Sequence, residues 1–333
     1  MINSHIIPAF YLEQFARPST RGPQNPGRIW VYEKGNEPDE RATSVQGREN
    51  GYFAYVKPDG TLEESFETVL ANREKECNDV LELAKSELYH WPSGSEEKLA
   101  FYAALLFRRA TQQRSFSDSN WQKIVDDIRQ AANDPEYMEA LALDITCKRG
   151  VPVTVETLRE SITDFIEEAT LPKSARNSFI SDLLEHVERG AWQLLNKRPW
   201  RVLRPPEGME FVTSDNPLVT FVPLGHGVLH PGYGFRREDA DAAFPLAPNA
   251  CLLMGHAWNV PTSLNKVAVD QLNDALISVS DRYVYSKTLS REIQDRVDQY
   301  GGSSRYGVNA FMPLGLKLPT AQQFLRAHFG LDD

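Results

Sequence analysis

Five ionisable residues from distant parts of the chain have the types that acid–base or metal-assisted chemistry requires. They are His5, Glu67, Glu74, Arg109 and Asp215. Carboxylates can activate water or hold a divalent cation, a guanidinium stabilises phosphate charge, and an imidazole moves protons near neutral pH. Such a set is suited to hydrolysis of an anionic substrate, provided that the fold gathers the five side chains around one cavity.

A polar turn, Ser214-Asp215-Asn216-Pro217, interrupts a β-rich apolar run between residues 211–213 and 218–221. Asp and Asn side chains bond nearby backbone groups and proline fixes φ, so the flanking strands would hold this turn at a defined position. We expect Ser214 and Asn216 to bind substrate beside Asp215. The alternative is a structural turn, in which the Asp215 carboxylate only accepts hydrogen bonds from backbone N–H groups.

The helix expected at residues 61–89 places two carboxylates at the border of its apolar stripe. On a helical projection, Glu67 and Glu74 lie close to that stripe. A half-buried carboxylate is costly unless a cation, a metal or hydrogen-bond donors compensate it. The next helix offers Arg109 on its apolar face, whereas Arg108 points nearly opposite. We predict a buried Glu67–Arg109 pair, which either takes part in chemistry or only fixes how two helices cross.

The pattern along the chain predicts an α+β fold with three segments. Residues 1–60 contain N-terminal strands, residues 61–197 form a helical block, and residues 198–333 are rich in strands and end in helices. The N-terminal and C-terminal strands are expected to form one mixed or antiparallel sheet, on which the central helical block packs.

Periodicity and turn residues give the expected bounds of the elements. Helices are expected at about 61–89, 96–114, 119–132, 135–148, 155–169, 173–196, 263–278 and 320–329. Strands are expected at about 28–32, 51–56, 200–203, 211–213, 218–222, 243–246, 251–255 and 282–285. Segment 223–240, which is rich in glycine, is expected to be the longest loop.

Composition narrows the class of protein. The chain has 333 residues, 41% of them hydrophobic, and a formal net charge of −10. The negative charge disfavours a general nucleic-acid coat protein, although local basic groups leave a small anionic ligand or a short nucleic acid as partner. No apolar stretch is long enough to span a bilayer, and no leader-like segment opens the chain. Three scattered cysteines favour neither a disulfide framework nor a zinc site, so we expect a soluble cytoplasmic protein.

One aromatic and basic segment resembles a nucleic-acid surface. Trp192 and Trp200 lie near Lys197, Arg198 and Arg201. However, a tryptophan at a helix end or at the start of a strand belongs to the core more often than to a binding surface, so we expect these two residues to be buried.

Standard cofactor motifs are missing. The sequence contains neither a phosphate-binding P-loop nor a dinucleotide-binding glycine motif between strand and helix, and it lacks the zinc-protease and esterase signatures. The oxygen ligands that the carboxylates offer suit Mg²⁺ or Mn²⁺ better than zinc.

A set of short motifs, spread over most of the chain, resembles the largely bacterial domain-of-unknown-function 4238 family. The motifs are His5-x-x-Pro8-x-x-Tyr11-Leu12-x-x-Phe15, Glu67-x-x-Leu70-x-x-x-Glu74, Arg109, Ser214-Asp215-Asn216-Pro217 and Pro245-Leu246-x-Pro248. The resemblance implies that these polar positions belong together, and it implies no activity.

Three functional hypotheses remain from the sequence. The first is a nuclease-like phosphodiesterase, in which Glu67, Glu74 and Asp215 hold a divalent cation or activate water. In it Arg109 stabilises phosphate charge, His5 moves a proton and Asn216 positions substrate. The second is a non-enzymatic module that senses a ligand or binds a partner and recognises a small anion. The third is a purely structural polar core.

Overall fold

The computed structural model describes residues 3–19, 22, 25–85, 92–196, 200–224, 228–232, 237, 239–255, 262–304 and 320–331. The chain divides into two compact units. The first unit comprises residues 1–54, 62–114 and 183–314, and the second comprises residues 55–61, 115–182 and 315–333. The fold is α+β, as predicted, and its sheets are antiparallel in the part of the chain that the structure describes.

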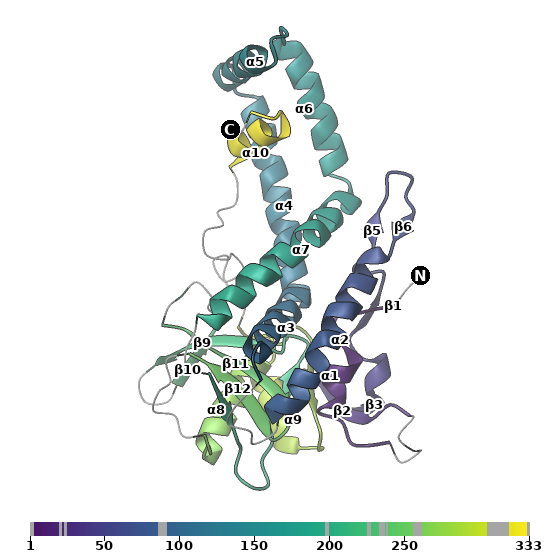
Figure 1. Ribbon diagram of the computed structural model, residues 1–333, viewed down its shortest axis with the longest axis vertical. Helices are drawn as coiled ribbons and strands as arrows, with labels where there is room; N and C mark the ends of the chain where they lie inside the picture. The colour runs from purple at the N-terminus through teal and green to yellow at the C-terminus, as the bar shows by residue number, and fades with distance from the viewer. Residues whose placement is uncertain are drawn as a thin grey trace. The chain divides into compact units, whose positions relative to one another are not determined.

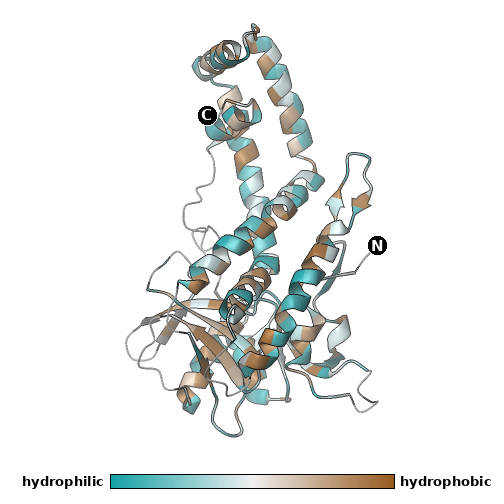
Figure 2. Ribbon diagram, in the orientation of Figure 1, coloured by the Kyte–Doolittle hydropathy of each residue, from teal (hydrophilic) through white to brown (hydrophobic). Residues whose placement is uncertain are grey.

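A five-stranded sheet forms the centre of the first unit (Figure 1). In spatial order its strands are β10 (Val228–Pro231), β9 (Val219–Leu224), β11 (Asp241–Ala247), β12 (Ala250–Met254) and β7 (Trp200–Leu203). Every residue of β11 and β12 is buried, and both strands are largely brown in Figure 2. Their nearly continuous apolar sequence is typical of strands that are covered on both faces.

A second sheet joins the two ends of the sequence. Its order is β3 (Asp39–Ala42), β2 (Arg28–Glu33), β13 (Tyr283–Ser286) and β8 (Thr213–Ser214). The predicted pairing of N-terminal with C-terminal strands is therefore confirmed. The single sheet that we expected is wrong, because the remaining C-terminal strands form the five-stranded sheet described above.

Helices of the first unit pack on these sheets. Helix α2 (Ser65–Lys85) contacts α3 (Ser95–Arg109) and β11, whereas α8 (Lys266–Ser278) lies against β8, β9 and β10. The short helix α1 (Ala9–Glu13) packs on β2 and on the 3-10 turn η1 (Thr43–Val45). Helix α9 (Arg291–Tyr300) packs on α8 and β2, and β1 (Asn3–His5) pairs with β4 (Arg48–Asn50).

Aromatic side chains fill the centre of the first unit. The Tyr11 ring stacks on Phe244, with 5.5 Å between ring centroids, and Tyr102 meets both rings edge-on. The Tyr11 hydroxyl lies 2.9 Å from Thr213 Oγ1 and donates to the Pro245 carbonyl at 2.7 Å. Tyr11 thereby ties α1 to β8 and β11.

The expected helix boundary at residues 114–119 is wrong. Helix α3 ends at Arg109, Ala110 is extended with φ −57° and ψ 143°, and α4 (Thr111–Ala132) begins at once. Neither glycine nor proline marks this break. Tertiary contacts specify it instead, because Thr111 Oγ1 donates to Asp281 at 2.5 Å and Gln112 donates to the Val279 carbonyl at 3.1 Å.

The second unit is helical. Its elements are α5 (Pro135–Arg149), α6 (Val155–Ala169), α10 (Ala321–His328), most of α4 and the first part of α7 (Pro172–Leu195), together with β5 (Tyr55–Val56). The strand β6 (Leu62–Glu63) follows in the first unit. Asp134 and Thr154 cap α5 and α6. The helix expected at about 320–329 is confirmed as α10, and its Leu325 is buried in the core cluster of this unit.

Segment 223–240 is not one continuous loop, because β10 lies within it and pairs with β9. This strand was not predicted, because the prolines and glycines around it are typical of a loop. Among the described residues, no helix is both long and apolar enough to cross a membrane.

Candidate functional site

Arg109 is the centre of a cluster of buried charge, which we call the Arg109 cluster: His5, Phe53, Glu67, Glu74 and Arg109. The Arg109 residue is 1% exposed. Its guanidinium donates to a Glu74 carboxylate oxygen and to the His5 carbonyl oxygen, and it lies over the Phe53 ring at 4.8 Å from the centroid. Helices α2 and α3, strand β1 and the turn before β5 therefore converge on one cation.

The ion pair joins Arg109 to Glu74 rather than to Glu67, the partner expected from the helical projection. Glu67 still acts on Arg109 through its charge. Burial lowers the pKa of Arg109 to about 10, and the Glu67 carboxylate opposes that shift. The guanidinium therefore stays a cation at neutral pH.

Two polar atoms of this cluster have no hydrogen-bond partner among the described residues. They are Glu67 Oε1 and Arg109 Nε, and both are buried. Buried polar groups are nearly always hydrogen-bonded, because an unmet donor or acceptor raises the free energy of the fold. A carboxylate and a guanidinium with unused capacity in one cluster can together bind a polar ligand or water.

His5 contributes its backbone to Arg109 and its ring to a different partner. His5 Nε2 accepts a hydrogen bond of 2.8 Å from Arg48 Nε, across the β1–β4 pair. Burial lowers the pKa of His5, and the charges of Arg48 and Arg109 lower it further. The imidazole is therefore neutral at pH 7, the form in which it can take up a proton.

The side chains of the 214–217 turn bond backbone groups. Both Asp215 carboxylate oxygens are engaged: Oδ1 accepts from the backbone N–H of Asp281 at 2.8 Å, and Oδ2 accepts from Arg282 at 2.7 Å and Tyr283 at 2.8 Å. Burial raises the pKa of Asp215 to about 6, and these three donors oppose the shift. This is backbone bonding of the kind that the structural alternative expected, although the N–H groups belong to residues 281–283, just before and at the start of β13, rather than to the turn itself.

Ser214 and Asn216 brace the same turn. Ser214 Oγ donates to the Asn216 carbonyl at 2.8 Å and accepts from the Asn216 backbone N–H at 3.2 Å. Asn216 Nδ2 donates to the Val279 carbonyl at 3.1 Å, whereas its Oδ1 is buried without a partner among the described residues.

The structure brings four of the predicted site residues together, namely His5, Glu67, Glu74 and Arg109. Within the described residues, no hydrogen bond or ion pair joins Asp215 to this cluster, and no three His, Cys, Asp or Glu residues form a group that could hold a metal ion. The two groups are nevertheless linked. Gln112 and Asn216 both donate to the Val279 carbonyl, and Gln112 lies three residues after Arg109, at the α3–α4 break.

The sequence did not predict several side chains that lie at or beside the site. Arg108 was expected to point outward but is 7% exposed and donates to Gln113 at 2.8 Å. Phe53 lies in a turn and Arg48 begins the three-residue strand β4, so neither segment is long enough to show a periodic pattern that would have marked them. Tyr11 was marked in the sequence only by the motif that also contains His5. Its hydroxyl donates to the carbonyl of Pro245, which belongs to the Pro245-Leu246-x-Pro248 motif.

The expectation of two buried tryptophans is wrong for one of them. Trp192 is 60% exposed, whereas Trp200 is half-buried and donates from its ring nitrogen to the Leu194 carbonyl at 3.2 Å. Lys197 and Arg198, which accompanied them in the sequence, lie outside the described residues.

Comparison with known proteins assigns the chain to a family. No curated protein and no solved structure matches the chain significantly. The model of one family, described as a protein of unknown function (DUF4238), matches residues 3–290, a range that includes every residue of the Arg109 cluster and the 214–217 turn. The chain therefore belongs to the DUF4238 family.

Proposed function

We propose that this protein is a hydrolase that acts on an anionic substrate, and specifically a nuclease-like phosphodiesterase whose reaction centre is the Arg109 cluster. One observation supports this most directly: Glu67 Oε1 and Arg109 Nε are buried without partners in the described part of the chain. A general base and a phosphate-binding cation each keep an unused polar atom in one cluster, which a water molecule and a phosphate oxygen can satisfy.

Each residue has a defined role in this proposal. Glu67 removes a proton from the attacking water, and Arg109 stabilises the charge that develops on the phosphate. Glu74 positions Arg109 through their ion pair. Neutral His5 takes part in proton transfer. Its Nε2 accepts a hydrogen bond from Arg48, and this bond must break before Nε2 can take up a proton.

The 214–217 turn is connected to the α3–α4 break, next to Arg109, through the shared Val279 carbonyl. Asp215 fixes the turn on the start of β13, which supports a positioning role for its carboxylate. Asn216 is anchored by its amide nitrogen and retains its buried Oδ1 as an acceptor for substrate.

A divalent cation fits the same proposal. Mg²⁺ is usually bound by one or two carboxylates together with substrate phosphates rather than by a cage made only of protein groups. Glu67 and the phosphate would supply such oxygens to Mg²⁺ or Mn²⁺. We also propose that the protein works in the cytoplasm, which is supported by Cys77, Cys147 and Cys251, all of them free thiols. The resemblance to a largely bacterial family further suggests a bacterial cell.

The test is hydrolysis of a phosphodiester by the full-length protein. The purified chain is incubated with bis(p-nitrophenyl) phosphate and with short single-stranded DNA and RNA, with and without Mg²⁺ or Mn²⁺. Glu67→Gln should lower kcat by about 10²–10⁴-fold and leave the melting temperature nearly unchanged. Glu76→Gln, on the exposed face of the same helix, is the matched control and should retain full activity. Equal turnover by wild type and Glu67→Gln would eliminate the assignment.

The second candidate is a non-enzymatic module that senses or binds a small anion. It is favoured by the existing bonds of Arg109, because a guanidinium held by Glu74 and by the His5 carbonyl is fixed in place without a substrate. In this case a ligand raises the melting temperature and is recovered unchanged. Product analysis of every stabilising ligand therefore separates the two candidates.

A further inference from the structure

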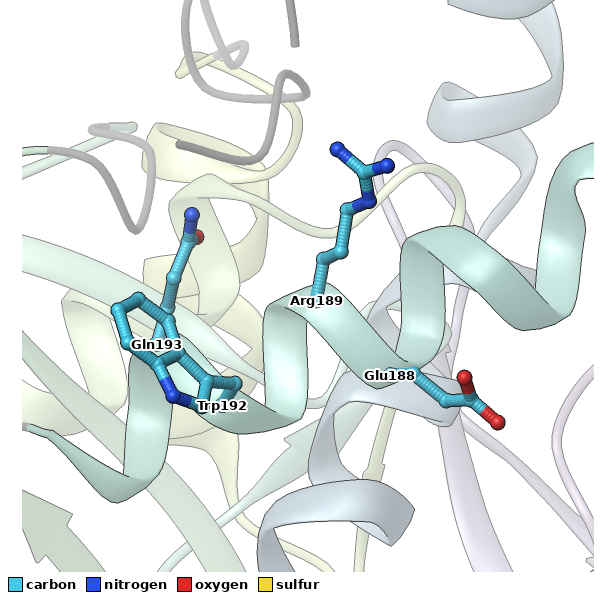
Figure 3. A pocket seen from close by; sticks show the side chains of 4 residues that line it. All are labelled: Glu188, Arg189, Trp192 and Gln193. Atoms are coloured by element: carbon cyan, nitrogen blue, oxygen red, sulfur yellow. The ribbon is translucent and has the colours of Figure 1, made fainter. Parts of the chain in front are cut away.

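The last turns of α7 carry a surface pocket of about 350 Å³ (Figure 3). The described residues that line it are Glu188, Arg189, Trp192 and Gln193. Arg189 lies three residues before Trp192 and four before Gln193, so helical geometry places these three side chains on one face. None of them belongs to the Arg109 cluster.

Trp192 gives the pocket a flat apolar surface. It is 60% exposed, although a buried indole would contribute more to the stability of the fold. An exposed tryptophan beside a hollow is the usual platform on which a planar heteroaromatic ring stacks.

Gln193 gives the pocket a directional polar group. The residue is 4% exposed, and its Oε1 has no hydrogen-bond partner among the described residues. Figure 3 shows the amide beside the indole of Trp192 and extending to the same side as the Arg189 guanidinium. A ligand N–H group would satisfy this buried acceptor.

Arg189 supplies a cation, and breaking its present ion pair with Glu185 costs little free energy. Its side chain is 40% exposed and pairs with Glu185, one turn earlier in the helix. Exposed ion pairs of this spacing contribute little to stability, so an incoming anion can replace the Glu185 carboxylate. The Glu188 carboxylate points away from the guanidinium and the amide in Figure 3, so it does not oppose an anion there.

We propose that this face of α7 is a nucleotide-binding site. The base stacks on Trp192 and donates an N–H to Gln193 Oε1, and the phosphate accepts hydrogen bonds from Arg189. The net charge of −10 disfavours a long polyanion, which restricts the ligand to a single nucleotide or to one nucleotide of a short strand. This inference does not depend on the proposed hydrolase activity.

Titration calorimetry on the full-length protein tests the site. The probes are the common nucleoside monophosphates, adenosine as the ring without the anion, ribose 5-phosphate as the anion without the ring, and a single-stranded tetranucleotide. We expect saturable binding of at least one monophosphate or of the tetranucleotide, and much weaker binding of ribose 5-phosphate. If a monophosphate binds as tightly as the tetranucleotide, the ligand is the free nucleotide. If only the tetranucleotide binds, the ligand is a nucleotide within a strand.

Three variants assign the binding to the pocket. Trp192→Ala should weaken affinity by about 5- to 150-fold, the range for loss of one stacked base, and Trp192→Phe should restore much of it. Arg189→Ala should weaken the phosphorylated probes and leave the affinity for adenosine unchanged. Arg291→Ala, which breaks an equally spaced exposed pair on α9, is the matched control and should bind like wild type.

Several outcomes would overturn the inference. They are the absence of saturable binding by any nucleotide, wild-type affinity in Trp192→Ala, and ribose 5-phosphate binding as tightly as the monophosphates. Melting temperatures of all variants show whether a loss of binding reflects unfolding. Trp192→Ala should leave the hydrolysis of bis(p-nitrophenyl) phosphate unchanged, because Trp192 lies outside the Arg109 cluster, so failure of this site and failure of the hydrolase proposal are distinguishable.

Discussion

The Arg109 cluster and the 214–217 turn solve the same problem, a buried charge, in different ways. Arg109 is compensated by an opposite charge on Glu74, a carbonyl and an aromatic face. Among the residues that the structure describes, Asp215 is compensated by three backbone N–H groups. The turn uses both oxygens of the Asp215 carboxylate, whereas in the cluster Glu67 Oε1 and Arg109 Nε find no partner within the described part of the chain. The comparison indicates that the Asp215 carboxylate fixes the turn in place, whereas the two charged groups of the cluster keep unused polar atoms, as Asn216 Oδ1 does within the turn.

The largest effect is expected where a charge would lose its opposite charge. Arg109→Ala leaves Glu74 buried without its cation and should lower the free energy of unfolding by about 3–5 kcal/mol. Urea denaturation followed by circular dichroism measures this loss, with Arg291→Ala as an exposed control that should change stability by less than about 1 kcal/mol. A loss below 1 kcal/mol for Arg109→Ala would mean that the ion pair does not hold the helices together.

The next effect distinguishes the turn by its pH dependence. The pKa of Asp215 is raised from 3.8 to about 6, so the folded state binds this proton more tightly than the unfolded state does. The stability contributed by that proton is complete below pH 3.8 and is lost as pH rises through 6, by up to about 3 kcal/mol.

The variant Asp215→Asn removes this titration. The difference in unfolding free energy between wild type and variant, measured from pH 4 to pH 7, should therefore fall as pH rises. A constant difference over that range would show that the three backbone donors hold the carboxylate ionised throughout. In that case the contrast with Arg109 would be one of geometry alone.

Loss of the neutral hydrogen bonds that join Tyr11 to Thr213 and Pro245 should lower stability by a smaller amount. Tyr11→Phe removes the donor to the Pro245 carbonyl and the partner of Thr213, both buried, and should cost about 1–2 kcal/mol. Thermal denaturation measures this loss. Tyr55→Phe, at a tyrosine that is 38% exposed, is the control and should leave the melting temperature unchanged. An equal loss in both variants would contradict a specific role for the Tyr11 hydroxyl.

The smallest effect is expected for the pKa of His5, which the charges near the Arg109 cluster lower. Because the charge of Arg48 contributes to the lowered pKa of His5, Arg48→Ala should raise that pKa. The pKa should stay below 6.5, since burial is the larger cause. NMR titration of the imidazole measures this, and stability should change by less than about 1 kcal/mol because the Arg48–His5 bond is exposed. If the pKa of His5 does not move, the charge of Arg48 contributes nothing to it, and burial, Arg109 and the backbone hydrogen bond with Ser44 determine it.

Local patterns predicted much of the fold. Residues 155–169 form α6 as expected, and the strands at 28–32 and 282–285 pair with each other. The break at Ala110 and strand β10 were missed because tertiary contacts, not local turn residues, specify them.

The candidate site was predictable only in part, for similar reasons. A helical projection indicates that Glu67, Glu74 and Arg109 face inward, but side-chain reach decides that Glu74 takes the ion pair. The bonds of Asp215 could not be foreseen, because its three donors lie more than 60 residues away in the sequence. Trp192 was assigned to the core because exposure of a single tryptophan leaves no mark on the periodicity of a helix.

The pairing of β2 with β13 also determines when during translation the second sheet can form. Tyr32 and Ser286, whose hydroxyl groups meet at 3.2 Å, are 254 residues apart. At translation rates of about 5–20 residues per second, the ribosome needs roughly 13–50 s to deliver the second strand after the first. During that interval one edge of the nascent β2–β3 hairpin has no neighbour, so we expect newly made chains to depend on chaperones until β13 has been made.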